Sequence, residues 1–138
     1  MKKQLFILPF LVLFSFSLQA EWKKIATNRN GDDFYIDDKK IKKEDNITYF
    51  WVLIDSPINA ISNRSGIKSV VSHQKCDCSN FKYKTLSWMY YKGKMGTGIS
   101  NSESEYDSIN FVSSNYWTYP SDKSVEKKVI IKVCDLDK

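Results

Sequence analysis

The chain has 138 residues, a formal net charge of +5, one histidine and three cysteines. This length is typical of one domain, and the charge is too small and too scattered to form the basic stripe of a nucleic-acid-binding protein. We therefore expect no nucleic-acid partner. A single histidine leaves little room for a Ser-His-Asp or Cys-His catalytic arrangement, so we expect neither enzyme activity nor a cofactor.

The first 20 residues have the layout of a bacterial secretory signal peptide. Two lysines precede an apolar run over residues 5–18, and Ala20 offers the small side chain at which signal peptidase cuts. The run is shorter than the roughly 20 apolar residues of a transmembrane helix, and no cysteine near Ala20 provides a lipobox. We predict a signal peptide over 1–20 and one domain over 21–138, periplasmic or secreted, with no transmembrane segment after cleavage. Its net charge is +3, since the two lysines leave with the signal peptide.

The first half of the predicted domain alternates between strand and turn patterns. Short strands are expected at 22–25 and 34–36, on either side of the turn sequence N-R-N-G-D-D. Residues 37–45, DDKKIKKED, balance acids and bases and predict a solvated connector. Residues 46–55, NITYFWVLID, form the strongest strand pattern, with apolar residues on both faces. Such a strand is normally central and covered on both sides.

The second half continues with strands at 67–78 and 81–91. The polar residues of the latter change parity near Thr85, which predicts a bulge or bend. Residues 92–105 contain G-x-x-G-x-G without the lysine and Ser/Thr of a phosphate-binding loop, so we expect a mobile loop. A further strand is expected at 109–119, ending at Pro120.

The last segment, residues 121–136, predicts a helix that starts after Pro120 with Ser121 or Asp122 as its cap. Its β-branched residues would also suit a strand, but the apolar residues recur at helical spacing. The apolar arc comprises Val125, Val129, Val133 and Leu136, with Ile130 and Cys134 at its edge.

The motif H-Q-K-C-D-C-S-N, residues 73–80, holds the only histidine and two of the three cysteines. A zinc site would use His73, Cys76, Cys78 and Cys134, but residues 73 and 76 point to opposite faces of a flat strand. A redox pair would need a low-pKa thiolate at a helix N-terminus, and the next residues predict a strand. A disulfide to the C-terminal helix would enclose about 57 residues and contribute roughly 4 kcal/mol. The spacing does not choose between Cys76 and Cys78 as its partner.

An ordered set of short motifs is similar to the surface-adhesin protein E-like family over residues 33–134. The motifs are F-Y-I-D (34–37), N-I-T-Y-F-W-V-L-I-D (46–55), D-C-S-N-F (77–81), M-G-T-G (95–98), W-T-Y-P (117–120) and I-I-K-V-C (130–134). The resemblance implies an α+β fold, with one antiparallel sheet of about six strands and a C-terminal helix tied to one face by a disulfide. It assigns that disulfide to Cys78 and Cys134, which leaves Cys76 as a free thiol.

The resemblance also implies a function. The family's named member is an outer-membrane lipoprotein that binds host matrix and serum proteins, whereas this chain lacks the lipid-attachment cysteine and adds Cys76. We therefore expect an exported, non-enzymatic binding module, adhesin-like in role, for host or envelope proteins or polysaccharide, with its ligand-binding residues unassigned. Three alternatives stay open: a periplasmic metal or thiol protein using the cysteine motif, a homodimer linked through Cys76, and a small envelope enzyme or enzyme inhibitor. The last would hold glycan on Trp88, Tyr90, Tyr91 or Trp117.

Overall fold

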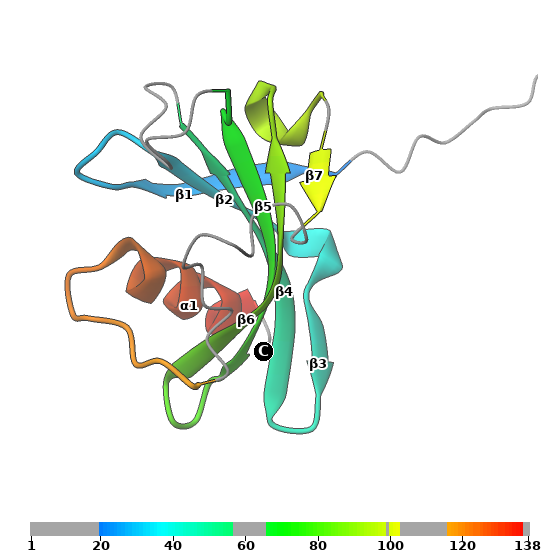
Figure 1. Cartoon of the computed structure of the whole chain (residues 1–138). Coiled ribbons are helices and arrows are strands. Elements are labelled where there is room, and N and C mark those ends of the chain that lie inside the picture. The colour runs from blue at the N-terminus through cyan, green and yellow to red at the C-terminus, as the bar shows by residue number, and fades with distance from the viewer. Residues whose placement is uncertain (1–19, 57–65, 99, 103–115, 137–138) are drawn as a thin grey trace, which may run out of the picture.

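The computed structural model describes residues 20–56, 66–98, 100–102 and 116–136, with the backbone alone for 100–102. Its strands form one antiparallel sheet in the order β1-β2-β4-β5-β6-β7, to which β3 is added by pairing with β4. The helix α1 lies on one face of this sheet (Figure 1). The predicted fold class is therefore confirmed. The elements are β1 (Trp22–Thr27), β2 (Asp33–Asp37), η1 (Asp38–Lys40), β3 (Lys42–Glu44), β4 (Ile47–Asp55), β5 (Ser69–Asp77), β6 (Lys82–Tyr91), η2 (Lys94–Gly96), β7 (Ser100–Ser102) and α1 (Val125–Leu136).

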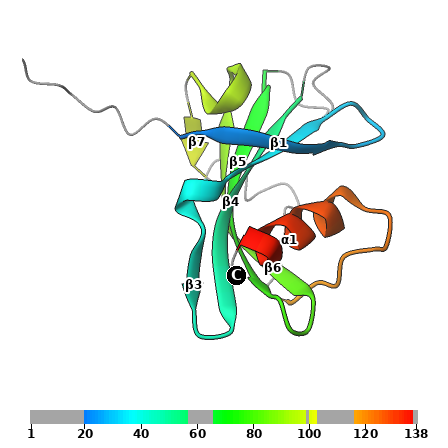
Figure 2. The ribbon, with the colours of Figure 1, turned by 180° about the vertical axis from the view of Figure 1, so that it is seen from behind.

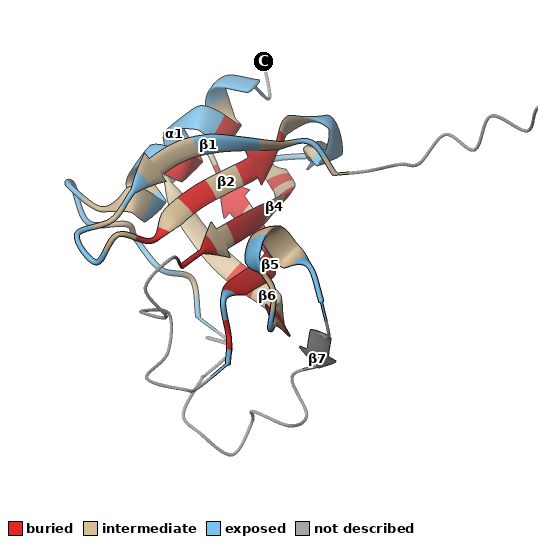
Figure 3. Ribbon diagram, turned by 90° about the horizontal axis from the view of Figure 1, so that it is seen from above, coloured by how far each residue is buried: buried red, intermediate tan, exposed pale blue. Residues whose placement is uncertain are grey.

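The strand β4 is central, as its doubly apolar pattern predicts. It pairs with β2 and β3 along one edge and with β5 along the other. Phe50 and Val52 are buried on the face that carries α1, whereas Leu53 is buried on the opposite face. Figure 3 shows buried residues along β2, β4 and β5. Residues on both faces of β4 are therefore shielded from water, which explains the run of apolar side chains.

The charged connector contains structure that the sequence pattern did not predict. Residues 38–40 form the 3₁₀ turn η1, and β3 pairs with the first half of β4 through Glu44 opposite Ile47 and Lys42 opposite Tyr49. All three residues of β3 are exposed, so no apolar alternation marks it as a strand. Backbone hydrogen bonds to β4 hold it in place, and such bonds leave no signature in side-chain polarity.

The bulge predicted near Thr85 is present. His73 of β5 pairs with Ser87, but the next residue, Gln74, pairs with Thr85, so Leu86 is an extra residue in β6. The extra residue reverses the side-chain alternation. Tyr83 and Thr85 before the bulge therefore face the helix side together with Trp88 and Tyr90 after it.

The helix α1 begins at Val125, later than the predicted start at Ser121 or Asp122. Ser124 is the cap, since its Oγ accepts a hydrogen bond of 3.1 Å from the backbone N–H of Lys127. Val129, Ile130 and Val133 are buried against the core of β2 and β4. Two predicted positions exchange roles: Leu136 is 42% exposed at the helix end, and Ile130 belongs to the buried stripe.

The helix is enclosed by the curvature of the sheet. It packs against β1, β2 and β4, and β1 runs above it in the view from behind (Figure 2). Its C-terminal turn is joined to the turn after β5 by the disulfide between Cys78 and Cys134, with Cα atoms 5.7 Å apart. The pairing implied by the family resemblance is therefore present.

The D-C-S-N-F motif is the turn that presents Cys78. Asp77 Oδ1 accepts hydrogen bonds from the backbone N–H groups of Ser79 and Asn80, and Asp77 Oδ2 accepts one of 2.7 Å from the Asn80 side chain. The Asn80 side chain is the main reason why the pKa of Asp77 is lowered. Asp77 thus fixes the loop that positions the disulfide.

The glycine-rich segment is a loop, as predicted, but its first part is firmly docked on the sheet rather than mobile. Met95 N–H donates to Asp55 Oδ1 at 2.8 Å, and Gly96 N–H donates to Ser69 Oγ at 2.9 Å. A Cβ at Gly93 would lie 2.5 Å from the carbonyl oxygen of Thr97, so this turn requires glycine. The strand expected at 109–119 lies mostly outside the described residues; within them, Thr118 forms one isolated bridge with Tyr83.

Candidate functional site

The sheet face opposite α1, which we call the open face, carries a band of half-buried aromatic and basic side chains. The strand register places these residues in rows that cross β4, β5 and β6. The rows are Tyr49, Lys75 and Lys84; Trp51, His73 and Ser87; and Leu53, Val71 and Met89. In the third row, Leu53 and Val71 are buried under Gly96, whereas the residues of the first two rows are half-buried.

The centre of the open face is an aromatic stack. The rings of Trp51 and His73 lie 4.4 Å apart between centroids with an interplanar angle of 15°, and Tyr49 lies 6.1 Å from His73. Partial burial lowers the pKa of His73, because it disfavours the charged imidazolium. His73 is therefore mainly neutral at pH 7 and stacks against Trp51. It makes no hydrogen bond to a carboxylate within the described part of the chain.

One end of the open face is extended by the W-T-Y-P segment. The bridge between Thr118 and Tyr83 aligns this segment with β6. Two ammonium groups lie over the Trp117 ring: Lys75 Nζ is 5.3 Å and Lys82 Nζ is 5.0 Å from its centroid. These cation–π contacts place two positive charges close to one aromatic ring.

The other end of the open face is hollowed. A depression of about 260 Å³ is lined by Trp22, Trp51, Met89 and Tyr91, with the docked glycine at position 96 at its side. A second depression of about 330 Å³ continues from Trp51 toward Tyr49, His73 and the lysines of η1 and β3. Trp51 and Lys40 line both depressions, so the two adjoin, and we call them together the Trp51 groove.

The four aromatic residues considered for glycan contact are separated by the fold. Tyr90 is buried on the helix side and Trp88 packs against it, so neither is available on the open face. Tyr91 lines the Trp51 groove, and Trp117 lies between Lys75 and Lys82. Trp51 and Trp22 were not predicted as site residues. The alternation over residues 47–55 places Trp51 on the same face of the strand as Tyr49 and Leu53, and this pattern could have identified Trp51 as a candidate.

The cysteine motif is divided between the two faces of β5. Cys76 is fully buried in the core beneath α1, and its Sγ lies 3.8 Å from that of Cys78. The sulfurs of Cys76, Cys78 and Cys134 all lie within 4.8 Å of one another. His73 is on the open face, so the structure does not bring the predicted Cys₃His ligand set together. The burial of Cys76 also leaves it inaccessible for a disulfide with a second chain.

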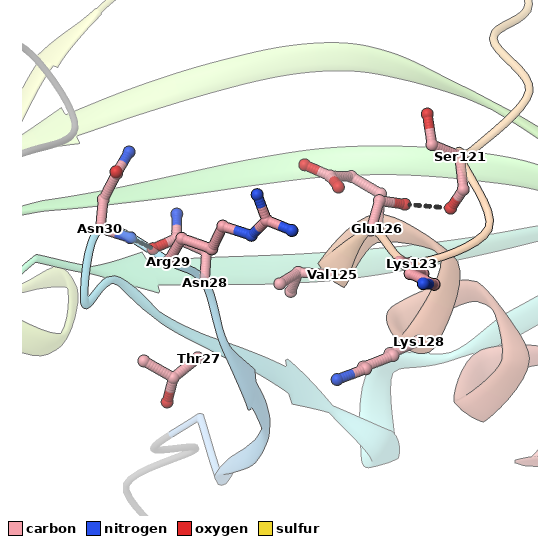
Figure 4. A pocket seen from close by; sticks show the side chains of 10 residues that line it. Thr27, Asn28, Arg29, Asn30, Ser121, Lys123, Val125, Glu126 and Lys128 are labelled. Carbon is pink, nitrogen blue, oxygen red and sulfur yellow. Dashed lines mark hydrogen bonds between the residues drawn. The ribbon is translucent and has the colours of Figure 1, made fainter.

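A polar cleft of about 620 Å³ lies on the helix side of the molecule, between the tip of the β1–β2 hairpin and the start of α1 (Figure 4). Arg29 points from the hairpin toward the first turn of the helix, and Lys123 and Lys128 approach from the helix side. Glu126 is the carboxylate at its rim. Among the described residues, no aromatic side chain lines this cleft, so it offers charge without an aromatic platform.

These features define a class of protein: a small sheet-and-helix domain whose one disulfide ties the helix to the sheet and whose opposite face is open and aromatic. No helix in the described part of the chain is long and apolar enough to cross a membrane. The model of the family described as surface-adhesin protein E matches residues 22–135. The chain belongs to the surface-adhesin protein E family. No curated protein sequence is detectably similar to it.

The fold is also that of solved structures of Haemophilus influenzae protein E. Crystal form II of that protein matches with a TM-score of 0.63 and 13% identity, over 88% of this chain and 93% of the other. A second structure matches with a TM-score of 0.57 and 13% identity, over 86% of each chain. Protein E from non-typeable Haemophilus influenzae gives 0.56 and 12%, over 87% and 79%. At this identity the likeness concerns the fold.

Proposed function

We propose that this protein is an exported, non-enzymatic, adhesin-like binding module that contacts extracellular or envelope macromolecules through its open face. Membership of the surface-adhesin family supports the adhesive role. The observation that carries the proposal is the position of Trp51, half-buried on a central strand, where it lines both depressions of the groove. Sites on strands are held more precisely than sites on loops, and tryptophan and tyrosine contribute most to binding at protein surfaces.

The opposite face supports a structural role instead. Phe50 and Val52 are buried beneath α1, and the disulfide closes that side of the domain. The single histidine stacks on Trp51 rather than activating a nucleophile. This arrangement supports binding, in which a preformed surface is sufficient, rather than catalysis, which requires a poised acid or base.

A binding panel tests this function. The chain from residue 21 onward would be offered to immobilised matrix proteins, envelope fractions and polysaccharides. We expect saturable binding to at least one class, weakened at least fivefold by Trp51→Ala and unchanged by Arg29→Ala in the helix-side cleft. Binding no greater than background across the panel, or equal losses in both variants, would show that the open face is not the contact surface.

Export is the second part of the proposal. The charged and apolar layout of residues 1–20 supports a signal peptide, and the family description supports an exported protein. N-terminal sequencing of the protein from the periplasm and the medium should find a chain that begins at Glu21. A chain that retains residues 1–20 in the cytoplasm would contradict export.

A further inference from the structure

The charge on the open face indicates the chemistry of its partner. Lysines from four elements surround the aromatic band: Lys40 of η1, Lys42 of β3, Lys75 of β5, and Lys82 and Lys84 of β6. Three of these lysines lie near a carboxylate: Lys40 is 3.7 Å from Asp37, Lys42 is 2.6 Å from Glu44 and Lys82 is 4.0 Å from Asp77. Lys75 has no carboxylate within ion-pair distance among the described residues, and its ammonium group lies over Trp117 instead. The five lysines outnumber these three carboxylates, so the open face carries an excess of positive charge.

The aromatic rings follow the strand direction between these charges. Trp117 marks one end beside Lys82, the stack of Trp51 and His73 lies in the middle, and Trp22 marks the other end. From Asp77 to Val71 the strand β5 advances by six residues, or about 20 Å at roughly 3.4 Å per residue. The open face thus offers an extended track rather than a compact pocket.

We propose that this track binds an acidic polysaccharide. Sugar rings would pack against Trp51 on the side that it shares with Trp22, and carboxylate or sulfate groups along the chain would meet Lys75 and Lys82 beside Trp117. This inference rests on the proposed function and adds the class of ligand to it. The lysines favour this ligand over a protein partner, because lysine is depleted in protein–protein interfaces, whereas the aromatic side chains suit both.

The decisive experiment compares two double variants that remove the same charge. Lys75→Gln with Lys82→Gln removes two charges from the open face, and Lys123→Gln with Lys128→Gln removes two from the helix-side cleft. Binding to heparin, an acidic polysaccharide, would be measured by calorimetry at several salt concentrations, with dextran as the neutral polymer. We expect the open-face pair to weaken heparin binding at least tenfold and to reduce its salt dependence, because fewer ions are released on binding. The cleft pair should change the affinity less than twofold.

The aromatic contribution needs its own variant. Trp51→Ala should weaken heparin binding about tenfold with little change in salt dependence, because it removes stacking and no charge. Trp51→Phe, which keeps a ring, should retain most of the affinity and serves if the alanine variant does not fold. Unchanged heparin binding in folded Trp51→Ala would overturn the stacking arrangement.

Other outcomes would overturn the ligand class. Equal losses in the two lysine pairs would mean that net charge alone attracts heparin. Tighter binding of single-stranded oligonucleotides than of heparin would assign the track to nucleic acid, since stacking rings beside basic residues also suit unpaired bases. Binding of matrix or envelope proteins without binding of heparin would reject this inference and leave the proposed function standing.

Discussion

The two faces of the central sheet are built from the same strands, but one forms the core beneath α1 and the other forms the open face. On the helix side, Phe50 and Val52 are almost fully buried and packed by α1. On the open side, the adjacent residue Trp51 is only half-buried and stacks on His73. Alternation along one strand therefore places a core residue and a surface platform at neighbouring positions. Whether an apolar residue of β4 belongs to the core or to a surface site therefore depends on the face that it occupies and on what covers that face.

Truncating one residue on each face should give the largest difference between the two faces. Phe50→Ala should lower the free energy of unfolding by about 4 kcal/mol, because it leaves a cavity under α1. Trp51→Ala should cost only about 1 kcal/mol, since its side chain is partly in water already. Urea denaturation measures both. Similar losses for the two variants would mean that the open face is a second core.

The disulfide should come next in size, and its variants test the cysteine cluster. Cys134→Ser should lower stability by about 2 to 4 kcal/mol, because the loop it closes is long. Cys78→Ser should cost less, because the buried Cys76 thiol lies close enough to Cys134 to replace it. Peptide mapping without reduction should then find a Cys76–Cys134 link. If the two variants lose equal stability and no such link forms, the nearness of Cys76 has no consequence.

The docked loop predicts a smaller effect. Ser69 is fully buried, and its Oγ donates to the carbonyl of Gly93 at 2.6 Å while accepting from Gly96 N–H. Ser69→Ala should therefore cost about 2 kcal/mol, because two polar groups lose their partner. Hydrogen exchange at Gly96 should accelerate. Ser79→Ala, at an exposed turn, is the matched control, and faster exchange in both variants would argue against a specific clamp.

The smallest effect is a pH dependence from the open face. Burial lowers the pKa of His73 in the folded protein from its ordinary value of 6.5. The unfolded chain therefore binds more protons as the pH falls below 6.5, so stability should decrease there and be fully present above it. His73→Gln should flatten this part of the stability profile. An identical profile in the variant would show that His73 is not the group responsible.

Much of the fold could be predicted from side-chain patterns, because the buried positions of strands and helices require apolar side chains. The doubly apolar 46–55 run gave the central strand, and the parity change at Thr85 gave the bulge. The helix was expected in the right place, but its start was set early, because Pro120 and Ser121 resemble a cap more than the true cap at Ser124 does. The strand β3 was missed, since its pairing rests on backbone hydrogen bonds.

The candidate site was harder to predict, because it depends on register. Trp51 and His73 meet only since β4 and β5 pair with these two residues opposite each other. Nothing in the local sequence of either strand specifies that alignment. Trp117 joins the site through a single bridge from a distant segment. The disulfide pairing, in contrast, was available through the family resemblance, although spacing alone left Cys76 and Cys78 equivalent.

The most direct test of a binding role for the open face is to map where a ligand contacts the protein. A short heparin oligosaccharide would be titrated into isotope-labelled protein, and chemical-shift changes would be followed by NMR at each amide and at each tryptophan indole. We predict changes at the Trp51 indole and at the amides of His73 and Lys75, with none at Arg29 or Lys128. Changes confined to the helix-side cleft, with the Trp51 signal unmoved, would contradict a binding role for the open face.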